Sequence, residues 1–188
     1  CIYTKFLCIT SLHFEFHLSL ILFDLFGEIH CNFFCTRSVY SDYYPGLKSY
    51  SNKNMSVSTA IKAVDKYVGF HNEKHKRGII IEPSITFYGG EPFLKFEIIK
   101  SVVNYCKSKN FKAKIYATTN GTIINDEIID FIIENEIHVM FSLDGYKENH
   151  DRNRVFANNI PTFELILENI KKIQKKKKKA GKRTIVNV

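Results

Sequence analysis

Hydrophobic residues follow two alternating patterns from residue 56 to the end of the chain. Short runs of β-branched and aromatic residues, typical of strands, alternate with longer stretches in which apolar residues recur every three or four positions, typical of amphipathic helices. The predicted strands are 85–88, 114–118, 138–142 and 184–188, and a helix is predicted before each of them. This alternation predicts parallel βαβ units, and therefore an α/β barrel or an open doubly wound sheet with its strands in chain order.

Capping residues indicate where the predicted helices begin and end. Ser56 and Asn125 carry short polar side chains directly before helical segments, so each is a predicted N-cap. Pro161 is predicted in the first turn of the last helix. Backbone N–H groups there have no acceptor within the helix, so the N–H that proline lacks is not needed. Gly181 is predicted to end that helix before the final strand.

Each internal strand ends in a polar turn that carries glycine. The turns are Gly89-Gly90-Glu91-Pro92, Thr119-Asn120-Gly121 and Ser142-Leu143-Asp144-Gly145. The carboxyl ends of parallel strands share one edge of a sheet, where barrels and open sheets bind their ligands. The sequence therefore predicts one site built from successive loops at this edge, within about one ligand length of the cysteine pair at 31 and 35.

Each of these turns also has a purely structural interpretation, which the sequence leaves open. Gly89 and Gly90 can form a helix entry that binds no ligand. Asn120 can be a turn residue in the left-handed conformation, and Ser142 or Asp144 can cap the next turn. It is the occurrence of three such turns at one edge that favours a binding site.

The composition is that of one globular unit. The chain has 188 residues, of which 45% are hydrophobic and 24% charged, with few prolines and glycines. These values exclude a disordered, collagen-like or low-complexity protein. We expect an atypical lead-in over residues 1–27 and one core domain over 28–188, truncated at its C-terminus because the sequence stops within a predicted strand.

The net charge of +8 is concentrated at one end of the chain. Residues 171–188 contain nine lysines and arginines and no acid, and the remaining residues together carry −1. Such a run is typical of the solvated end of a helix and its loop, so nucleic acid is not an expected partner. The alternative, a nucleic-acid contact by Lys175 to Lys179, would show strong salt dependence.

The cysteine content indicates a reducing compartment. Five cysteines are an odd number and too few for a secreted disulfide framework, so we predict a cytoplasmic protein. The longest apolar run, Leu18 to Phe26, contains Asp24 and is far shorter than the ~20 residues that a membrane span needs. A membrane is therefore not an expected partner. Cys106 lies on an apolar helical stripe, which predicts a buried, inert thiol.

Six segments, taken in order, resemble the radical SAM superfamily. They are Cys31-Asn32-Phe33-Phe34-Cys35, Tyr40-Ser41-Asp42-Tyr43-Tyr44, Phe87-Tyr88-Gly89-Gly90-Glu91-Pro92-Phe93-Leu94, Thr119-Asn120-Gly121-Thr122, Ser142-Leu143-Asp144-Gly145 and His150-Asp151-Arg152-Asn153-Arg154. The resemblance covers roughly residues 28–188 and is closest to the peptide- and protein-maturing branch, which is related to the sulfatase maturases and usually carries a C-terminal SPASM domain. It implies a partial (β/α) barrel with about five of the six expected parallel strands.

The resemblance also implies an iron–sulfur cluster. In this family a CxxxCxxC loop after the first strand supplies three thiolates to a 4Fe-4S cluster, and S-adenosylmethionine (SAM) binds the fourth iron. Cys31 and Cys35 match the first two ligands, and Ser38 occupies the third position. Because a serine oxygen is a harder donor than a thiolate and has a much higher pKa, we expect a labile or absent cluster.

Eight further residues are implied to surround SAM. They are Gly89, Gly90, Glu91, Pro92, Asn120, Ser142, Asp144 and Arg154. The backbone of 89–92 would bind the methionine ammonium, Ser142 the ribose or methionine portion, and Arg154 the carboxylate. Asn120 and Asp144 would line the same edge. His150 is interpreted as a loop histidine that binds no ligand.

The function implied by the resemblance is that of a radical SAM enzyme, a peptide or protein maturase. In such enzymes the reduced cluster cleaves SAM to a 5′-deoxyadenosyl radical, which abstracts hydrogen from a peptide substrate. An electron donor such as flavodoxin or ferredoxin is the other implied partner. The alternative is a non-catalytic degenerate homologue or fragment that lacks a stable cluster because Ser38 replaces the third cysteine.

Overall fold

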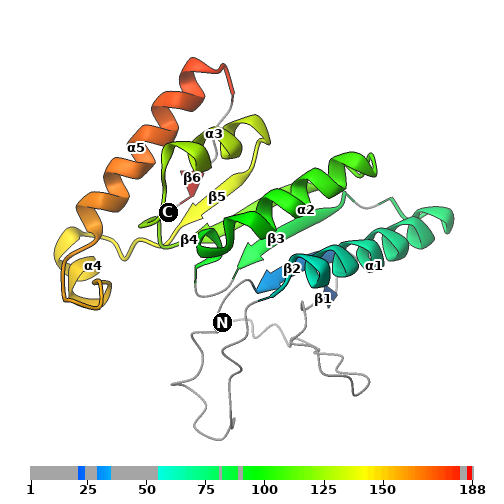
Figure 1. The fold of residues 1–188 in the computed structure, drawn as a ribbon, viewed down its shortest axis with the longest axis horizontal. Coiled ribbons are helices and arrows are strands. Elements are labelled where there is room, and N and C mark those ends of the chain that lie inside the picture. Colours follow the sequence, from blue (N-terminus) through cyan, green and yellow to red (C-terminus); the bar gives the residue numbers. More distant parts are fainter. Residues whose placement is uncertain are drawn as a thin grey trace, which may run out of the picture.

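The computed structural model describes residues 21–23, 29–34, 55–80, 82–88, 91–182 and 186–187, and of 21–23, 29–34 and 186–187 the backbone alone (Figure 1). In chain order the elements are β1 (Ile21–Phe23), β2 (Ile29–Phe34), α1 (Val57–Lys76), β3 (Ser84–Tyr88), η2 (Pro92–Lys95), α2 (Phe96–Ser108), β4 (Lys114–Thr119), α3 (Asp126–Glu134), β5 (His138–Phe141), α4 (Lys147–Asn153), α5 (Phe163–Lys179) and β6 (Val186–Asn187).

The strands form one sheet in the order β1-β2-β3-β4-β5-β6. β1 is antiparallel to β2, and each later pair of neighbours is parallel. The parallel part confirms the predicted sheet with its strands in chain order. β1 was not expected, since residues 1–27 were interpreted only as an atypical lead-in to a strand. A strand of three residues is too short to show an alternation of apolar and polar positions. It is recognised in the structure by its antiparallel pairing with β2.

The helices cover one face of the sheet (Figure 1). Right-handed crossovers between strands in chain order place every crossover helix on the same side. Burial alternates accordingly: Ile85 and Phe87 on β3 and Phe141 on β5 are buried in the core, whereas Tyr88 is 38% exposed and Met140 49% exposed. A parallel sheet with its helices on one face is the arrangement of a (β/α) barrel, and the chain forms part of one.

Two predicted N-caps are confirmed, and one helix begins later than expected. The side chains of Ser56 and Asn125 accept hydrogen bonds from the backbone N–H groups of Thr59 at 3.1 Å and Ile128 at 2.9 Å, respectively. Helix α5 begins at Phe163, so Pro161 lies outside its first turn. The reason is a short antiparallel bridge to Val155, which holds Pro161 in an extended backbone.

The lysine-rich run forms the end of α5, as predicted, but it is not fully solvated. Three of its lysines pair with acids: Lys172 with Glu168, Lys176 with Asp126 and Asp130, and Lys182 with Glu136. Lys177 is only 2% exposed, and burial lowers the pKa of its ammonium group. The expectation of a solvated face is therefore wrong for Lys177, which lies on the packed side of α5.

Helices α1, α2, α3 and α5 are amphipathic and bury one stripe each. On α1, the longest described helix, the buried residues are Ala60, Val64 and Tyr67, and polar or charged residues make up most of the remaining positions. Within the described ranges, the combination of length and apolar character that crossing a bilayer requires is not met by any helix.

Candidate functional site at the carboxyl edge of the sheet

The loops after β3 and β4 meet at the side chain of Glu91. This residue follows β3 closely, and only 3% of its surface is exposed. Its Oε1 accepts hydrogen bonds from Thr119 Oγ1 at 2.8 Å and from the backbone N–H of Phe93 at 3.1 Å. Its Oε2 accepts a hydrogen bond from the backbone N–H of Asn120 at 2.7 Å. One carboxyl group therefore joins the two strand ends.

The electrostatics of Glu91 match this connecting role. Burial raises the pKa of its carboxyl group above the ordinary value, and the hydrogen bonds from Asn120, Thr119 and Phe93 oppose that rise. A buried acid is tolerated only when donors satisfy its oxygens, and three donors do so here. The carboxyl group therefore sets the position of the backbone that a ligand at this edge would meet.

The turn at 119–122 is fixed by hydrogen bonds along its whole length. Thr119 Oγ1 accepts from the backbone N–H of Gly121 at 2.9 Å, and Asn120 Oδ1 accepts from the N–H of Thr122 at 2.9 Å and from its hydroxyl at 2.8 Å. Asn169, buried on α5, donates from Nδ2 to the carbonyl of Gly121 at 2.9 Å. The turn is thus tied both to itself and to α5.

Gly121 allows this turn to pack against β5. Its φ is +74°, and a Cβ at this position would lie 2.7 Å from a ring carbon of Phe141. Both the backbone conformation and the close approach favour glycine. Beside it, the backbone N–H of Ser142 donates to the carbonyl of Thr119 at 2.9 Å, which places the loop after β5 next to the turn after β4.

These contacts confirm the predicted common edge for three of the turns. Glu91, Asn120 and Ser142 lie at the carboxyl ends of neighbouring parallel strands and are joined through hydrogen bonds. Pro92 opens η2 directly after Glu91. Gly89 and Gly90 lie outside the described residues.

Two polar side-chain groups at this edge make no hydrogen bond to another described residue. Because Asn120 Oδ1 accepts two hydrogen bonds from Thr122, the carboxamide is oriented and its Nδ2 is left as a donor. Of the residues that the structure describes, none is a hydrogen-bond partner of Asn120 Nδ2 or of the Ser142 hydroxyl. Both side chains are half-buried. A ligand oxygen could be bound here by an amide donor and a hydroxyl.

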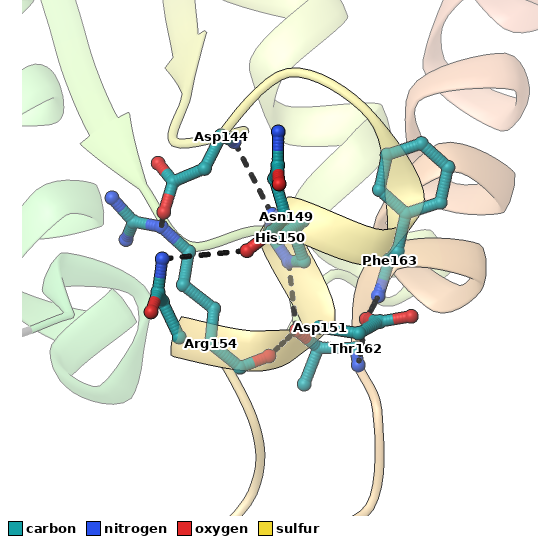
Figure 2. Close-up of polar contacts among 8 residues, drawn as sticks. Asp144, Asn149, His150, Asp151, Arg154, Thr162 and Phe163 are labelled. Carbon is teal, nitrogen blue, oxygen red and sulfur yellow. Dashed lines mark hydrogen bonds and ion pairs between the residues drawn. The ribbon is translucent and has the colours of Figure 1, made fainter.

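Asp144 and Arg154 form an ion pair beyond β5 (Figure 2). Arg154 Nε lies 2.8 Å from Asp144 Oδ2, and this contact holds the pKa of the Asp144 carboxyl group below its ordinary value. The two terminal guanidinium nitrogens point away from the Asp144 carboxylate in Figure 2. Arg154 therefore commits its Nε to Asp144, while its terminal nitrogens are not part of this contact.

His150 differs from its expected setting. It lies within α4, its side chain is completely buried, and both ring nitrogens make hydrogen bonds, to Asp144 and to Thr162. The interpretation as a loop histidine is therefore wrong. Helix α4 has seven residues, mostly polar, and their pattern carries no apolar stripe that would predict a helix.

The expected cluster ligands are only partly described. Cys31 lies inside β2, paired with Ile85 of β3, so the expectation that it belongs to a loop is wrong. Cys35 and Ser38 lie outside the described residues. Among the described residues, no group of three or more His, Cys, Asp or Glu side chains could hold a metal ion. Cys106 is buried as predicted, and burial raises the pKa of its thiol to about 11, which leaves it unreactive.

Several residues that organise this edge were not identified from the sequence. Thr119 was placed in a turn but not recognised as a partner of Glu91. Asp151, Thr162 and Asn169 were not singled out, because each acts through contacts with residues distant in the sequence. The one available signal is a polar residue on an apolar helical stripe, as for Asn169 between Ile166 and Ile170.

Comparison with known proteins identifies a family. The model of the Radical SAM superfamily matches residues 30–188, which is most of the chain. A cysteine-type anaerobic sulfatase-maturating enzyme from Clostridium novyi (strain NT) is 36% identical over 108 residues, covering 55% of this chain and 29% of that protein. The radical SAM cyclopropyl synthase TigE from Paramaledivibacter caminithermalis is 28% identical over 150 residues, covering 74% of this chain and 31% of that protein.

A solved structure, native anSMEcpe with bound AdoMet (SAM), has a TM-score of 0.62 and 25% sequence identity to the chain. The match covers 81% of this chain and 41% of that one. The chain thus spans about a third of the length of the curated relatives described above. The fold of the described residues is accordingly that of a partial radical SAM barrel.

Proposed function

Because the chain belongs to the radical SAM superfamily, a family of enzymes that use SAM and a 4Fe-4S cluster, we propose that it binds SAM at the carboxyl edge of its sheet and acts as a peptide or protein maturase. The observation that carries this proposal is the convergence of Glu91, Asn120 and Ser142 on one edge. Polar groups left free at that edge match the polar groups of SAM.

The carboxylate, the ammonium and the oxygens of the ribose or methionine portion of SAM each have a proposed partner. The terminal nitrogens of Arg154 bind the methionine carboxylate in a bidentate manner, since Nε is already held by Asp144. The Ser142 hydroxyl and Asn120 Nδ2 bind oxygens of the ribose or of the methionine portion. The methionine ammonium binds backbone carbonyls of the turn at 89–92, whose last part Glu91 fixes.

The chain's donor set fits the cluster at two of three positions. Cys31 and Cys35 supply thiols, the soft donors that cluster iron prefers, and Ser38 supplies a harder oxygen at the third position. When the cluster and SAM are bound, their one-electron chemistry supplies a 5′-deoxyadenosyl radical for removal of a substrate hydrogen atom. The residues of this chain orient SAM and hold the loops around it, and we expect the Ser38 oxygen to hold the iron weakly.

The proposed substrate is a peptide or protein. Support comes from the sulfatase-maturating relative, whose name describes an enzyme that acts on another protein, at 36% identity over 108 residues. Flavodoxin or ferredoxin is the proposed electron donor. The relatives are about three times as long as the matched region, so the substrate-binding parts of the whole protein are not specified by this edge alone.

The test is SAM cleavage by the anaerobically reconstituted chain. After reconstitution with iron and sulfide, the protein is reduced with dithionite in the presence of SAM, and 5′-deoxyadenosine is quantified by liquid chromatography. We expect a low yield that rises in the Ser38→Cys variant and disappears in Cys35→Ala. A Ser38→Cys protein that holds a full cluster, binds no SAM and forms no 5′-deoxyadenosine would contradict the proposal.

A further inference from the structure

His150 has a fixed hydrogen-bonding state that the geometry around it dictates. The backbone N–H of Asp144 can only donate, so His150 Nδ1, 3.3 Å away, must accept (Figure 2). Thr162 Oγ1 donates its single proton to the carbonyl of Arg154 at 2.7 Å. The same hydroxyl, 3.0 Å from His150 Nε2, must therefore accept from it. The ring is neutral, and its proton is on Nε2.

These contacts connect His150 to both ends of the segment that carries the ion pair. On one side the ring holds the backbone nitrogen of Asp144, and on the other it holds Thr162, which in turn holds the backbone carbonyl of Arg154. The backbone of Asp144 and the backbone of Arg154 are thus both held, and their side chains form the ion pair, with Arg154 Nε 2.8 Å from Asp144 Oδ2. Although His150 touches neither charged group, it fixes the backbone of both.

A second set of contacts makes α4 a rigid support for His150. Asp151 Oδ1 accepts hydrogen bonds from the backbone N–H groups of Thr162 at 3.2 Å and Phe163 at 3.0 Å. It thereby caps the start of α5 from a neighbouring helix, since Thr162 makes no side-chain cap of its own. Asp151 Oδ2 is paired with Lys147 at 2.5 Å. The ring of Phe163 packs edge-on against the imidazole, with the ring centres 5.6 Å apart.

We propose that His150, in its neutral form with the proton on Nε2, is the positioning residue that holds the Asp144–Arg154 pair in place at the carboxyl edge of the sheet. The proposal deepens the proposed function, because it rests on Arg154 as the group that receives the SAM carboxylate. It assigns His150 no contact with SAM itself.

Protonation of His150 would disrupt this arrangement. A proton on Nδ1 would face the N–H of Asp144, replacing a hydrogen bond with two opposed donors. The charged groups around the ring are two acids, Asp144 and Asp151, and two bases, Lys147 and Arg154, while the described start of α5 presents the uncharged Phe163 and its N-cap Thr162. With both signs of charge present, burial is the largest influence and lowers the pKa of His150, so the ring stays neutral at pH 7.

The primary test follows the Arg154 Nε–H proton by NMR in the full chain. In the wild type we expect a resolved, slowly exchanging signal, and an imidazole nitrogen spectrum typical of the Nε2–H form. The Arg154 signal should be lost as the pH falls through the titration of His150, and also in His150→Gln at pH 7. The matched control is His75→Gln, at an exposed position on α1, which should leave the signal unchanged. An Arg154 signal insensitive both to pH and to His150→Gln overturns the proposal.

A second pair of variants covers the case in which His150→Gln does not fold. Thr162→Ser keeps the hydroxyl that joins His150 to Arg154, whereas Thr162→Val removes it at nearly the same size. We expect the Arg154 signal in the serine variant and its loss in the valine variant. Equal signals in the two variants overturn the proposal.

SAM binding separates this proposal from the proposed function. In the reconstituted Ser38→Cys chain, His150→Gln should weaken SAM binding at least tenfold, and it should have no further effect when Arg154→Gln is also present, because both substitutions then act on the same contact. Equal losses in the presence and absence of Arg154→Gln would overturn the positioning role. A Ser38→Cys chain that holds a full cluster and binds no SAM would refute the proposed function, while the NMR results would still decide the role of His150.

Discussion

Glu91 Oε2 lies 2.7 Å from the backbone nitrogen of Asn120, and this contact joins the end of β3 to the end of β4 at the edge where the candidate site lies. The same carboxyl group also accepts from Thr119 and Phe93. Its burial means that each of these donors would lack a partner if the carboxyl group were removed.

Glu91→Gln should therefore destabilise the protein. The amide oxygen can keep the contacts of Oε1, but the amide NH₂ would then face the N–H of Asn120, so one buried hydrogen bond is lost. We expect a loss of about 1–3 kcal/mol in the free energy of unfolding, measured with urea. The matched control is Glu97→Gln on α2, whose side chain is 76% exposed and pairs with Lys100. Equal stabilities of the two variants would show that Glu91 is not a structural connection.

Gly121→Ala tests the close packing of the turn at 119–122. Alanine would be strained at a φ of +74°, and its Cβ would lie 2.7 Å from the buried ring of Phe141. The control is Gly78→Ala, which has a φ of +78° and no atom within 4 Å of the added Cβ. We expect about 1–2 kcal/mol of destabilisation in the control from backbone strain, and a further ~1–3 kcal/mol at Gly121 from overpacking. Urea unfolding that gives the same loss for both would contradict the packing described here.

The burial of His150 predicts a loss of stability in acid. Its pKa is lowered in the folded state, so below the unfolded value of about 6.5 the unfolded chain binds more protons than the folded chain. Stability should therefore fall as the pH drops from 7.5 to 5.5, and the fall should be smaller in His150→Gln. His138 also has a lowered pKa, so the comparison between wild type and variant isolates the His150 part. Identical pH dependence in the two proteins would be inconsistent with a buried, neutral His150.

Ser38→Cys tests whether the third ligand position limits the cluster. Restoring a thiolate should raise iron and sulfide toward four of each per chain after anaerobic reconstitution and should add a broad visible absorption. The wild type should hold less iron and lose it in air. The control is Ser41→Cys, which adds a thiol three residues further along and should not raise the iron content. A wild-type chain that already holds a full, stable cluster would show that Ser38 is not a defect.

The sequence predicted the parallel sheet, the helices on its face and the edge where the loops gather, because these follow from periodicity and from the handedness of crossovers. It did not predict α4 or the setting of His150. The seven residues of α4 have no apolar stripe, and what stabilises the helix is the contact of Asp151 with the start of α5. Contacts of this kind join residues far apart in sequence, so no local pattern reports them.

The candidate site, too, was predicted only in part. Turn positions predicted that Asn120 and Ser142 lie at one edge, and the family resemblance implied Arg154 beside them, but neither predicted that Arg154 Nε is held by Asp144. Lys177 shows the same limit: its place in a lysine run predicts exposure, whereas its position on the packed side of α5 buries it. Composition predicts that the lysine run as a whole is exposed, but the position of each residue around the helix axis determines whether its side chain is buried.

The most direct test of the account is the affinity of SAM for the reconstituted Ser38→Cys chain, measured by calorimetry with and without a further substitution of Arg154. Arg154→Gln removes the proposed partner of the SAM carboxylate. Arg152→Gln, two residues away on α4, removes an exposed guanidinium whose hydrogen bond, among the described residues, is to Asn149. We predict at least tenfold weaker binding for Arg154→Gln, about 1.4 kcal/mol or more, and unchanged binding for Arg152→Gln. Unchanged affinity in both variants, or no SAM binding by a chain with a full cluster, would contradict the account.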